Sequence, residues 1–454
     1  MIRFIYNLFW PVGLLFFLPG YLVKMFRRGN YRHKFGQRLG CYNVDLGARL
    51  ARQRSTWLHA VSVGEVAVAL KLARQLQSIE PDLHCVLTTT TTTGFSLANR
   101  NAPPWIEVMY SPLDFWLIMR RAFAVIRPVR LVLVEAEIWP NLVAEAHARR
   151  IPIALVNARL SPRSERRFHR FRFFVAPTFR LLDLVCVPEP EDVDRWAALR
   201  VQRSRIHHTG SIKYDPENVD VEPMLPEKVL RDLQIDNPEI IGAREHFRSR
   251  PILFGGSTHP GEEEMLAQVF LRLRQRFPSL CLFIAPRHVE RVRGIRKQLE
   301  ALSLSVQLSS QAGSHSEAKP DCVLLDRTGE LQFWYGTATV VFIGKSLTAH
   351  GGQNPVEPIV VGKPVIFGPN MENFATLAKM LVSRNGAIQV CDAGTLEQAV
   401  DKLLHDKETR RALVENAEQV LMEHRGATAR TAALISNLRV AVDGSRTGAL
   451  QSAE

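Results

Sequence analysis

His59-Ala-Val-Ser-Val-Gly-Glu-Val66 is the stretch in which a predicted strand turns into a predicted helix. Residues 57–63 form a short apolar run that breaks at Gly64, and residues 65–76 carry apolar side chains at helical spacing. In open parallel sheets such a turn lies at the carboxyl edge of the strands, where ligands bind. Glu65 would occupy the first helical turn, where the dipole favours an ionised carboxylate able to accept a proton from a hydroxyl. An ordinary capping glutamate fits the same pattern.

Length and composition predict a globular protein of two or three domains, since the chain has 454 residues and 46% of them are hydrophobic. The six cysteines include no Cys-x-x-Cys pair, which predicts reduced thiols in a cytoplasmic fold and neither a disulfide framework nor a zinc site. The net charge of +13 favours an anionic partner, either nucleic acid, acidic lipid or a phosphorylated substrate. No short nucleic-acid-binding motif is present, so we expect no nucleic acid, and we expect no metal or cofactor.

The N-terminal segment predicts membrane attachment. Residues 4–23 are rich in apolar side chains and uncharged, and residues 24–38 are strongly basic. Twenty apolar residues just span a bilayer, and the basic cluster would remain on the cytoplasmic side. No small-residue cleavage site follows, so a retained anchor within residues 1–40 is favoured over a signal peptide. Pro11 and Pro19 leave open a kinked helix inserted into one leaflet.

After residue 55, strands and helices alternate, and polar side chains follow the strands. Strands are predicted over residues 83–88, 129–134, 153–156 and 184–187. The strand exits carry Glu65, Thr88–Thr93, Glu135, Glu137, Asn157 and Arg159. The threonine run predicts either an anion-binding turn or an edge of β-branched residues. Glu135 and Glu137, two apart on extended backbone, would share one face. Together these exits predict a lined cleft.

A basic and aromatic helix is predicted over residues 163–180. Arg163, Arg166, Arg167 and Arg170 fall at helical spacing on one face, and Phe168, Phe171 and Phe174 fall on an adjacent face. The pattern is typical of a helix on an anionic membrane surface or against lipid phosphates. It also fits a solvated basic face that packs through its phenylalanines.

Residues 215–250 lose periodicity and contain four prolines, which predicts a linker, and the second half then repeats the alternation. Gly255 and Gly256 follow a strand predicted over residues 251–254, and Ser257 and Thr258 precede a helix. This turn predicts either an anion site at a helix N-terminus or a well-capped helix start. Two halves with lined edges suggest a ligand between them, and the absence of dinucleotide and P-loop motifs disfavours those enzymes. We expect domains at 41–225 and 226–440, and a flexible tail at 441–454.

The order of motifs resembles the 3-deoxy-D-manno-octulosonic acid (Kdo) transferases, GT-B glycosyltransferases of lipopolysaccharide assembly. The resemblance runs to about residue 430 and rests on HAVSVGEV, TTTTTTG, EAEIWPN, NARLS, TGSIKYD, GGSTHPGEEE, APRHVER, TGEL, GGQNPVEP and GKPVIFGPNMENF. It implies two doubly wound Rossmann-like domains facing a cleft, the first binding the acceptor and the second the nucleotide sugar. It also implies inverting transfer of Kdo from CMP-Kdo to the lipid A precursor, lipid IVA, at the cytoplasmic face of the bacterial inner membrane.

The resemblance also implies site residues. Glu65 matches the general base, and Glu135 and Lys213 match positions that stabilise the transition state, where a cation offsets the donor carboxylate and the departing phosphate. The positions that match CMP-binding segments are Pro286, Arg287, Thr328, Gly329, Glu330, Asn354 and Glu357. Further anion or acceptor contacts are expected at Ser257, Thr258, Arg159, Arg163 and Arg166.

The chain departs from the usual family pattern at several positions. Thr328 stands where Met is usual, Gln353 replaces His, Lys345 replaces the second glycine of Gly-Gly-Ser, and Ala136 replaces Thr. These changes leave the matched catalytic groups in place and concern substrate detail. The alternatives are a GT-B relative using another nucleotide sugar, a sugar-nucleotide epimerase of similar build, and a non-catalytic membrane-bound homologue. A nucleic-acid binder would rest on charge alone.

Overall fold

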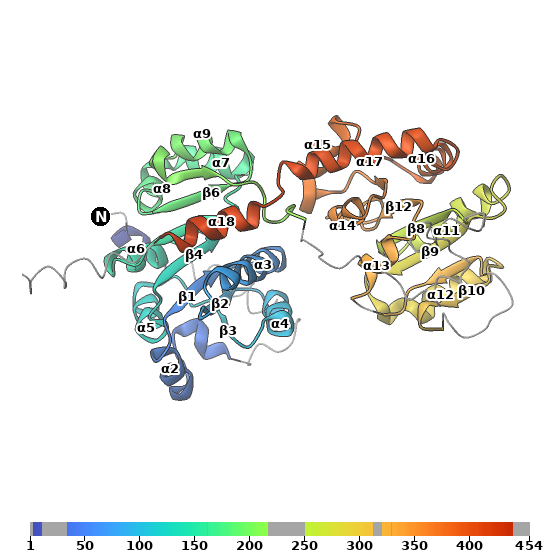
Figure 1. Cartoon of the computed structure of the whole chain (residues 1–454). Coiled ribbons are helices and arrows are strands. Elements are labelled where there is room, and N and C mark those ends of the chain that lie inside the picture. Colours follow the sequence, from blue (N-terminus) through green and yellow to red (C-terminus); the bar gives the residue numbers. More distant parts are fainter. Residues whose placement is uncertain are drawn as a thin grey trace, which may run out of the picture. The chain divides into compact units, whose positions relative to one another are not determined.

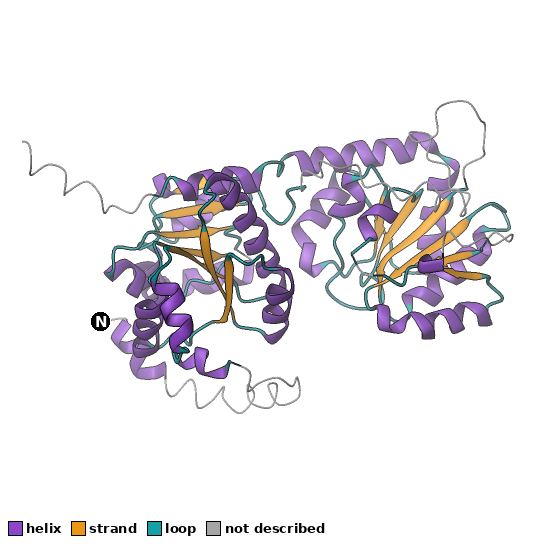
Figure 2. Cartoon of the chain, turned by 60° about the horizontal axis from the view of Figure 1, so that its bottom comes forward, coloured by secondary structure: helices purple, strands orange, loops and turns teal. Residues whose placement is uncertain are grey.

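The structure, a computed structural model, describes residues 3–10, 34–160, 162–216, 250–311, 320–327 and 329–438. The chain divides into two compact units, one of residues 1–215 with 424–454 and one of residues 216–423. Each unit is a seven-stranded parallel sheet with helices on both faces (Figure 1, Figure 2). The predicted class of two Rossmann-like α/β domains is therefore confirmed.

The sheet of the first unit has the strand order β3-β2-β1-β4-β5-β6-β7. Its strands are β1 Ser55–His59, β2 His84–Thr89, β3 Ile106–Tyr110, β4 Arg130–Val134, β5 Ile153–Val156, β6 Leu184–Val187 and β7 Ile206–His208. Its helices are η1 Phe35–Leu39, α2 Val44–Ala51, α3 Val63–Ile79, α4 Thr92–Asn101, α5 Trp116–Ile126, α6 Pro140–Ala148, α7 Pro162–Arg170, α8 Arg172–Phe179, α9 Pro190–Ala198, η2 Arg203–Arg205 and α18 Ala427–Ser436. Successive side chains of β1 enter different cores, Trp57 on one face and Leu58 on the other.

The sheet of the second unit has the order β10-β11-β9-β8-β12-β13-β14. Its strands are β8 Ile252–Thr258, β9 Cys281–Pro286, β10 Val306–Leu308, β11 Cys322–Leu324, β12 Val340–Ile343, β13 Val365–Phe367 and β14 Ile388–Gln389. Its helices are α11 Glu262–Leu273, η3 Val289–Arg291, α12 Val292–Ala301, η4 Ser309–Gln311, α13 Leu331–Tyr335, α14 Val356–Val360, η5 Glu372–Phe374, α15 Ala375–Ser383, α16 Ala393–His405 and α17 Lys407–Met422. Periodicity had not indicated β3, β10 or β14, and the last two are only two or three residues long.

Helix α18 belongs to the first unit, although the sequence placed residues 226–440 in one C-terminal domain. Buried Ala432 and Ile435 of α18 join the core beneath α3, beside which α18 lies in Figure 1. Burial of this apolar face explains why the chain returns after residue 423, and no local sequence signal marks the return.

The N-terminal helix, residues 3–10, lies on the first unit through polar contacts. The Tyr6 hydroxyl donates to Asp114 Oδ2 at 3.0 Å, and Arg3 and Asn7 donate to Asn141 Oδ1 at 3.0 and 2.9 Å. Within the described ranges, no helix is both long and apolar enough to span a bilayer. The rest of the expected anchor, residues 11–33, falls outside the described residues.

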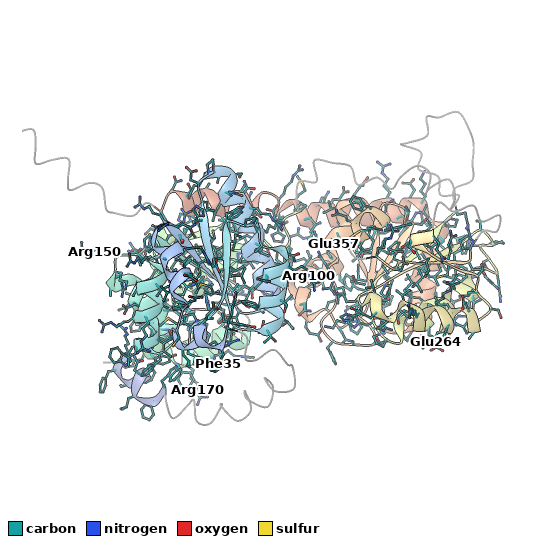
Figure 3. The ribbon with its side chains drawn as sticks, turned by 90° about the horizontal axis from the view of Figure 1, so that it is seen from below. Phe35, Arg100, Arg150, Arg170, Glu264 and Glu357 are labelled. Carbon is teal, nitrogen blue, oxygen red and sulfur yellow. The ribbon has the colours of Figure 1, made fainter. Side chains whose placement is uncertain are left out.

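The expected basic helix at 163–180 is in fact two helices, α7 and α8, which meet at Phe171. Phe168 packs on buried Phe179 with ring centroids 5.3 Å apart, whereas Phe171 and Phe174 are about half exposed. The predicted single aromatic face is therefore wrong, because the break turns Phe168 towards the core. Arg166 and Arg170 are exposed, and Arg170 can be located in Figure 3.

His59, at the end of β1, gives the fold a predictable response to acid. It is 1% exposed, and burial lowers the pKa of its imidazole from 6.5 to about 4. Between these values the unfolded chain binds more protons than the folded one, so stability falls as the pH decreases from 6.5 to 4.

We predict that His59→Gln reduces the slope of the unfolding free energy against pH in this range. The reduction should correspond to about one bound proton at most. Thermal unfolding of wild type and variant between pH 7 and pH 4 measures the slope. The exposed His147 on α6 supplies the control His147→Gln, which should keep the wild-type slope. Equal slopes for His59→Gln and wild type would contradict the assignment.

Candidate active site

Glu65 lies in the first turn of α3, as the sequence predicted, and it is 6% exposed. Ser62 is the N-cap and accepts a hydrogen bond from the Glu65 N–H at 3.3 Å. One carboxylate oxygen of Glu65 accepts from the Val61 N–H at 2.7 Å. The carboxylate therefore holds the turn that precedes its own helix.

The threonine run supports this turn from the neighbouring strand. Thr89 and Thr91 both donate through Oγ1 to the Val61 carbonyl, each at 3.2 Å. Thr91 also caps α4 by accepting from the Gly94 N–H at 3.0 Å. These two hydroxyls bind the backbone of the protein. An edge of β-branched residues therefore fits the structure better than an anion-binding turn.

The exits of β4 and β5 use backbone conformations that few side chains adopt. Glu135 has φ +61° and Asn157 has φ +50°, both in the left-handed region. Asparagine tolerates this region, but for glutamate it costs roughly 1 kcal/mol or more and recurs at functional sites. The expectation that Glu135 and Glu137 lie on continuous extended backbone is wrong, because β4 ends at Val134 and the chain turns at Glu135.

Four charged side chains share the carboxyl edge of this sheet. Burial raises the pKa of Glu135, the nearby Glu65 carboxylate raises it further, and Lys213 and Arg159 oppose the rise. Burial also lowers the pKa of Lys213, with Glu135 opposing and Arg159 reinforcing that effect. The structure thus brings Glu65, Glu135, Lys213 and Arg159 into one electrostatic neighbourhood.

Glu137 extends the acidic cluster. Burial raises its pKa, and so do Glu65 and Glu135. Trp139 opposes the rise by donating its Nε1–H to Glu137 Oε2 at 2.9 Å. Of the other expected acceptor contacts, Arg166 is exposed on α7 and the side chain of Arg163 lies outside the described part. No contact links Arg166 to the carboxylates among the described side chains.

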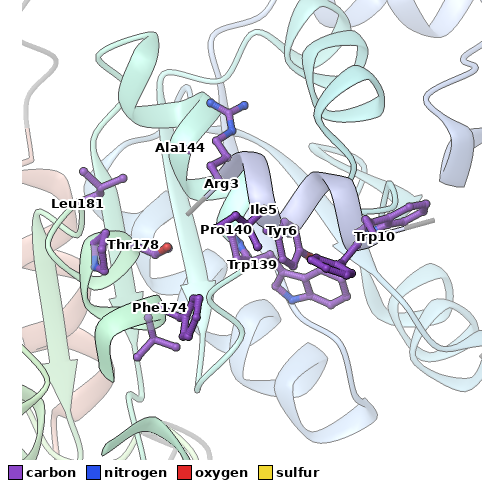
Figure 4. Close-up of a pocket in the computed structure, with 13 residues that line it drawn as sticks. Arg3, Ile5, Tyr6, Trp10, Trp139, Pro140, Ala144, Phe174, Thr178 and Leu181 are labelled. Atoms are coloured by element: carbon purple, nitrogen blue, oxygen red, sulfur yellow. The ribbon is translucent and has the colours of Figure 1, made fainter. Parts of the chain in front are cut away.

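An apolar groove of about 850 Å³ begins beside this cluster in the same unit (Figure 4). The N-terminal helix, the start of α6 and the face of α8 supply its walls. The lining residues are Arg3, Ile5, Tyr6, Phe9, Trp10, Trp139, Pro140, Ala144, Phe174, Val175, Pro177, Thr178 and Leu181. Trp139, bonded to Glu137, connects the groove to the acidic edge. No local sequence pattern predicts the groove, because its walls come from three distant segments.

In the second unit, the expected nucleotide-binding residues lie at several strand exits. Pro286 ends β9, and the N–H of the exposed Arg287 donates to the Thr258 carbonyl at 3.0 Å. Asn354 Nδ2 donates to Glu357 Oε1 at 3.0 Å, which orients the exposed carboxylate labelled in Figure 3.

Gly329 and Glu330 lie just before α13, where Gly329 has φ +91° and Glu330 is the N-cap residue. Thr328, the remaining expected CMP contact, lies outside the described residues.

Ser257 and Thr258 belong to β8, which runs four residues further than the predicted strand over residues 251–254. Thr258 Oγ1 donates to Glu263 Oε1 at 2.9 Å. At the N-terminus of α11, the side chain of Glu262 from the helix itself accepts a hydrogen bond from the His259 N–H at 2.9 Å. The capped-helix reading therefore fits this turn better than an anion site.

Glu262 is a structural residue that the sequence reasoning missed. It is fully buried and also accepts from the backbone N–H groups of Lys345 and Ser346, at 2.8 and 3.1 Å. The loop after β12 also passes close to the backbone of Ser257. Gly344 allows this approach, because a Cβ there would lie 2.3 Å from the Ser257 carbonyl oxygen. Burial lowers the pKa of His259, and the nearby Lys345, which has φ +59°, lowers it further. In the described ranges, no three acidic, histidine or cysteine side chains are grouped to hold a metal ion.

Two Rossmann-like units, one with an acidic and cationic edge, define a GT-B-like enzyme architecture. A UDP-GlcNAc 2-epimerase from Neisseria meningitidis shares the fold, with a TM-score of 0.53 over 84% of this chain and all of that one, at 12% identity. The profile described as 3-deoxy-D-manno-octulosonic-acid transferase matches residues 33–216, and that of glycosyl transferases group 1 matches residues 320–420.

Full-length relatives extend this match. The chain is 33% identical to the 3-deoxy-D-manno-octulosonic acid transferase of Haemophilus influenzae, over 88% of this chain and 90% of the relative. The Chlamydophila psittaci enzyme of the same name is 29% identical, over 94% of both chains. The protein belongs to the Kdo transferase family and is a glycosyltransferase.

Proposed function

We propose that this enzyme transfers Kdo from CMP-Kdo to a lipid A precursor, lipid IVA, with inversion at the anomeric carbon and Glu65 as the general base. The observation that carries the proposal is the grouping of Glu65, Glu135 and Lys213 at one sheet edge of a Kdo transferase family member. Each is a residue type that the reaction requires at the transferring carbon.

In the proposed reaction, Glu65 accepts the proton of an acceptor hydroxyl. The resulting nucleophilic oxygen forms a bond to the anomeric carbon as the bond from that carbon to the CMP phosphate oxygen breaks. The electron pair of that bond leaves with CMP, and a single displacement inverts the configuration. The hydrogen bond from the Val61 N–H holds the Glu65 carboxylate in place at the start of α3 while it accepts the proton.

Lys213 and Glu135 would stabilise the charges that develop during the transfer. The ammonium of Lys213 offsets the donor carboxylate and the departing phosphate, and both effects are strengthened because Lys213 is half buried. Glu135 offsets positive charge on the sugar ring and holds the ammonium nearby. The mixed charges of the cluster suit a substrate that is itself anionic and becomes transiently cationic at one carbon.

We assign the donor nucleotide to the second unit. Glu357, held by Asn354, suits the two ribose hydroxyls, because a carboxylate accepts from both. Arg287 at the end of β9 is exposed and free to reach an anionic group. Gly329, at φ +91°, turns the backbone ahead of α13 near Glu330.

The first unit would receive the lipid acceptor at the cytoplasmic face of the inner membrane. The groove beside Trp139 is apolar, and its volume of about 850 Å³ can take part of an acyl chain, while exposed Arg166 and Arg170 suit its phosphates. The N-terminal segment at residues 1–40 would attach the enzyme to the membrane that carries this substrate.

Replacing Glu65 by Gln should lower kcat about 100-fold or more, since the amide cannot accept the proton, while CMP affinity stays unchanged. The measurement is transfer of labelled Kdo from CMP-Kdo to lipid IVA, with CMP binding by calorimetry. Glu264→Gln, at an exposed position of α11, is the control and should retain activity. Wild-type turnover by Glu65→Gln would remove Glu65 from the mechanism, and failure of the wild type with CMP-Kdo would favour another nucleotide sugar.

Filling the groove should weaken use of the lipid selectively. Ala144→Phe is expected to raise the KM for lipid IVA about 10-fold and leave the KM for CMP-Kdo unchanged, because the larger side chain occupies space for an acyl chain. Ala124→Phe, on the exposed face of α5, is the matched control. An equal effect on a deacylated, water-soluble acceptor would show that the groove does not hold acyl chains.

A further inference from the structure

Lys213 lies in a loop that is tied to the returning end of the chain. We call residues 209–215 the lysine loop and residues 424–431 the return segment, and both belong to the first unit. The loop follows β7 and is the last part of this unit before the chain leaves it. The return segment is the first part after the chain comes back.

Asp215 makes the central contacts between the two. It is 6% exposed, and its Oδ1 accepts from the Gly426 N–H at 2.8 Å. Its Oδ2 accepts from the Thr428 N–H at 2.8 Å and from the Thr428 hydroxyl at 2.5 Å. Asp215 thus caps α18 from a position more than 200 residues earlier in the chain. Three hydrogen bonds to one buried carboxylate fix its geometry closely.

The start of the loop is held by the same segment. Arg430 donates to the Thr209 carbonyl through Nη2 at 2.8 Å and Nε at 3.1 Å. His424 Nδ1 accepts from the Ser211 N–H at 3.3 Å. Gly210, at φ +83°, is packed so closely that a Cβ would lie 3.2 Å from the Ala427 Cβ.

The inner side of the loop touches the candidate active site. Ser211 Oγ donates to the side-chain carbonyl of Asn157 at 3.3 Å, at the exit of β5. The backbone carbonyl of Asp215 accepts from the ammonium of Lys71, which lies on α3, the helix that carries Glu65. The loop is therefore fixed on one side by the return segment and on the other by the elements that hold the carboxylates.

We propose that Asp215 is a positioning residue that, through Gly426 and Thr428 of the return segment, holds the lysine loop so that the Lys213 ammonium stays beside Glu135. A lysine side chain is long and flexible, so its charge is placed accurately only if its backbone is fixed. A displacement of about 1 Å at a catalytic group costs on the order of 100-fold in rate. The proposal rests on the proposed role of Lys213 in Kdo transfer.

Asp215→Ala should lower kcat about 10- to 100-fold and leave the affinity for CMP unchanged. The alkaline limb of the kcat profile should move to higher pH, because a loosened Lys213 gains water and its lowered pKa rises. The matched control is Asp406→Ala, which removes a similar aspartate cap from α17 in the second unit. It should lower thermal stability without the loss of kcat or the shift in pH profile.

A double-mutant cycle separates positioning from general stability. If Asp215 acts through Lys213, Asp215→Ala should have no further effect on kcat in a Lys213→Ala background. Additive losses, or a kcat of Asp215→Ala equal to wild type below its unfolding temperature, would overturn the proposal. Should Asp215→Ala fail to fold, Thr428→Val removes one donor to the carboxylate and should show a smaller shift of the same kind. If Lys213→Ala itself retained full Kdo transfer, the proposed function would fail, which is a different result from failure of the positioning role.

Discussion

The opposed charges of Glu65, Glu135 and Lys213, held together in a partly buried edge, set the requirements for the rest of the first unit. Burial opposes the charged forms of Glu135 and Lys213, and the Glu65 carboxylate raises the pKa of Glu135 further. A nearby ammonium makes such an arrangement stable enough to persist, provided that it cannot move away. The surrounding structure therefore has to fix backbone as well as side chains.

That fixation comes from three separate sources. A threonine hydroxyl at the end of β2 donates to the carbonyl of Val61, and the N–H of the same residue donates to the Glu65 carboxylate. The strained backbone at Glu135 is held by the neighbouring strand β5, because the Glu135 N–H donates to the Val156 carbonyl at 2.9 Å. The return segment holds the lysine loop from outside the sheet. The charged residues at this sheet edge are thus held in place mainly by hydrogen bonds to the backbone.

The two units share one sheet plan but use carboxylates differently at their edges. In the first unit, acids remain grouped near a lysine and an arginine. In the second, Glu262 is bonded to backbone N–H groups of the loop after β12, and Glu263 is paired with Arg291 at 2.8 Å. Buried acids of the second unit therefore shape loops, whereas Glu357 is exposed and accepts a hydrogen bond from Asn354. The two edges therefore differ in chemistry, although both units have the same parallel-sheet plan.

Local periodicity and turn chemistry were enough to predict the alternation of strands and helices, the turn that carries Glu65 and the polar residues at strand exits. The sequence also determined the family, through motifs distributed over both halves. Four features emerge only in the folded chain: the left-handed turn at Glu135, the return of α18 to the first unit, the backbone donors to Glu262 and the groove beside Trp139. Each of these depends on contacts between segments far apart in the chain, and such contacts are fixed by packing and shared hydrogen bonds that no local pattern encodes.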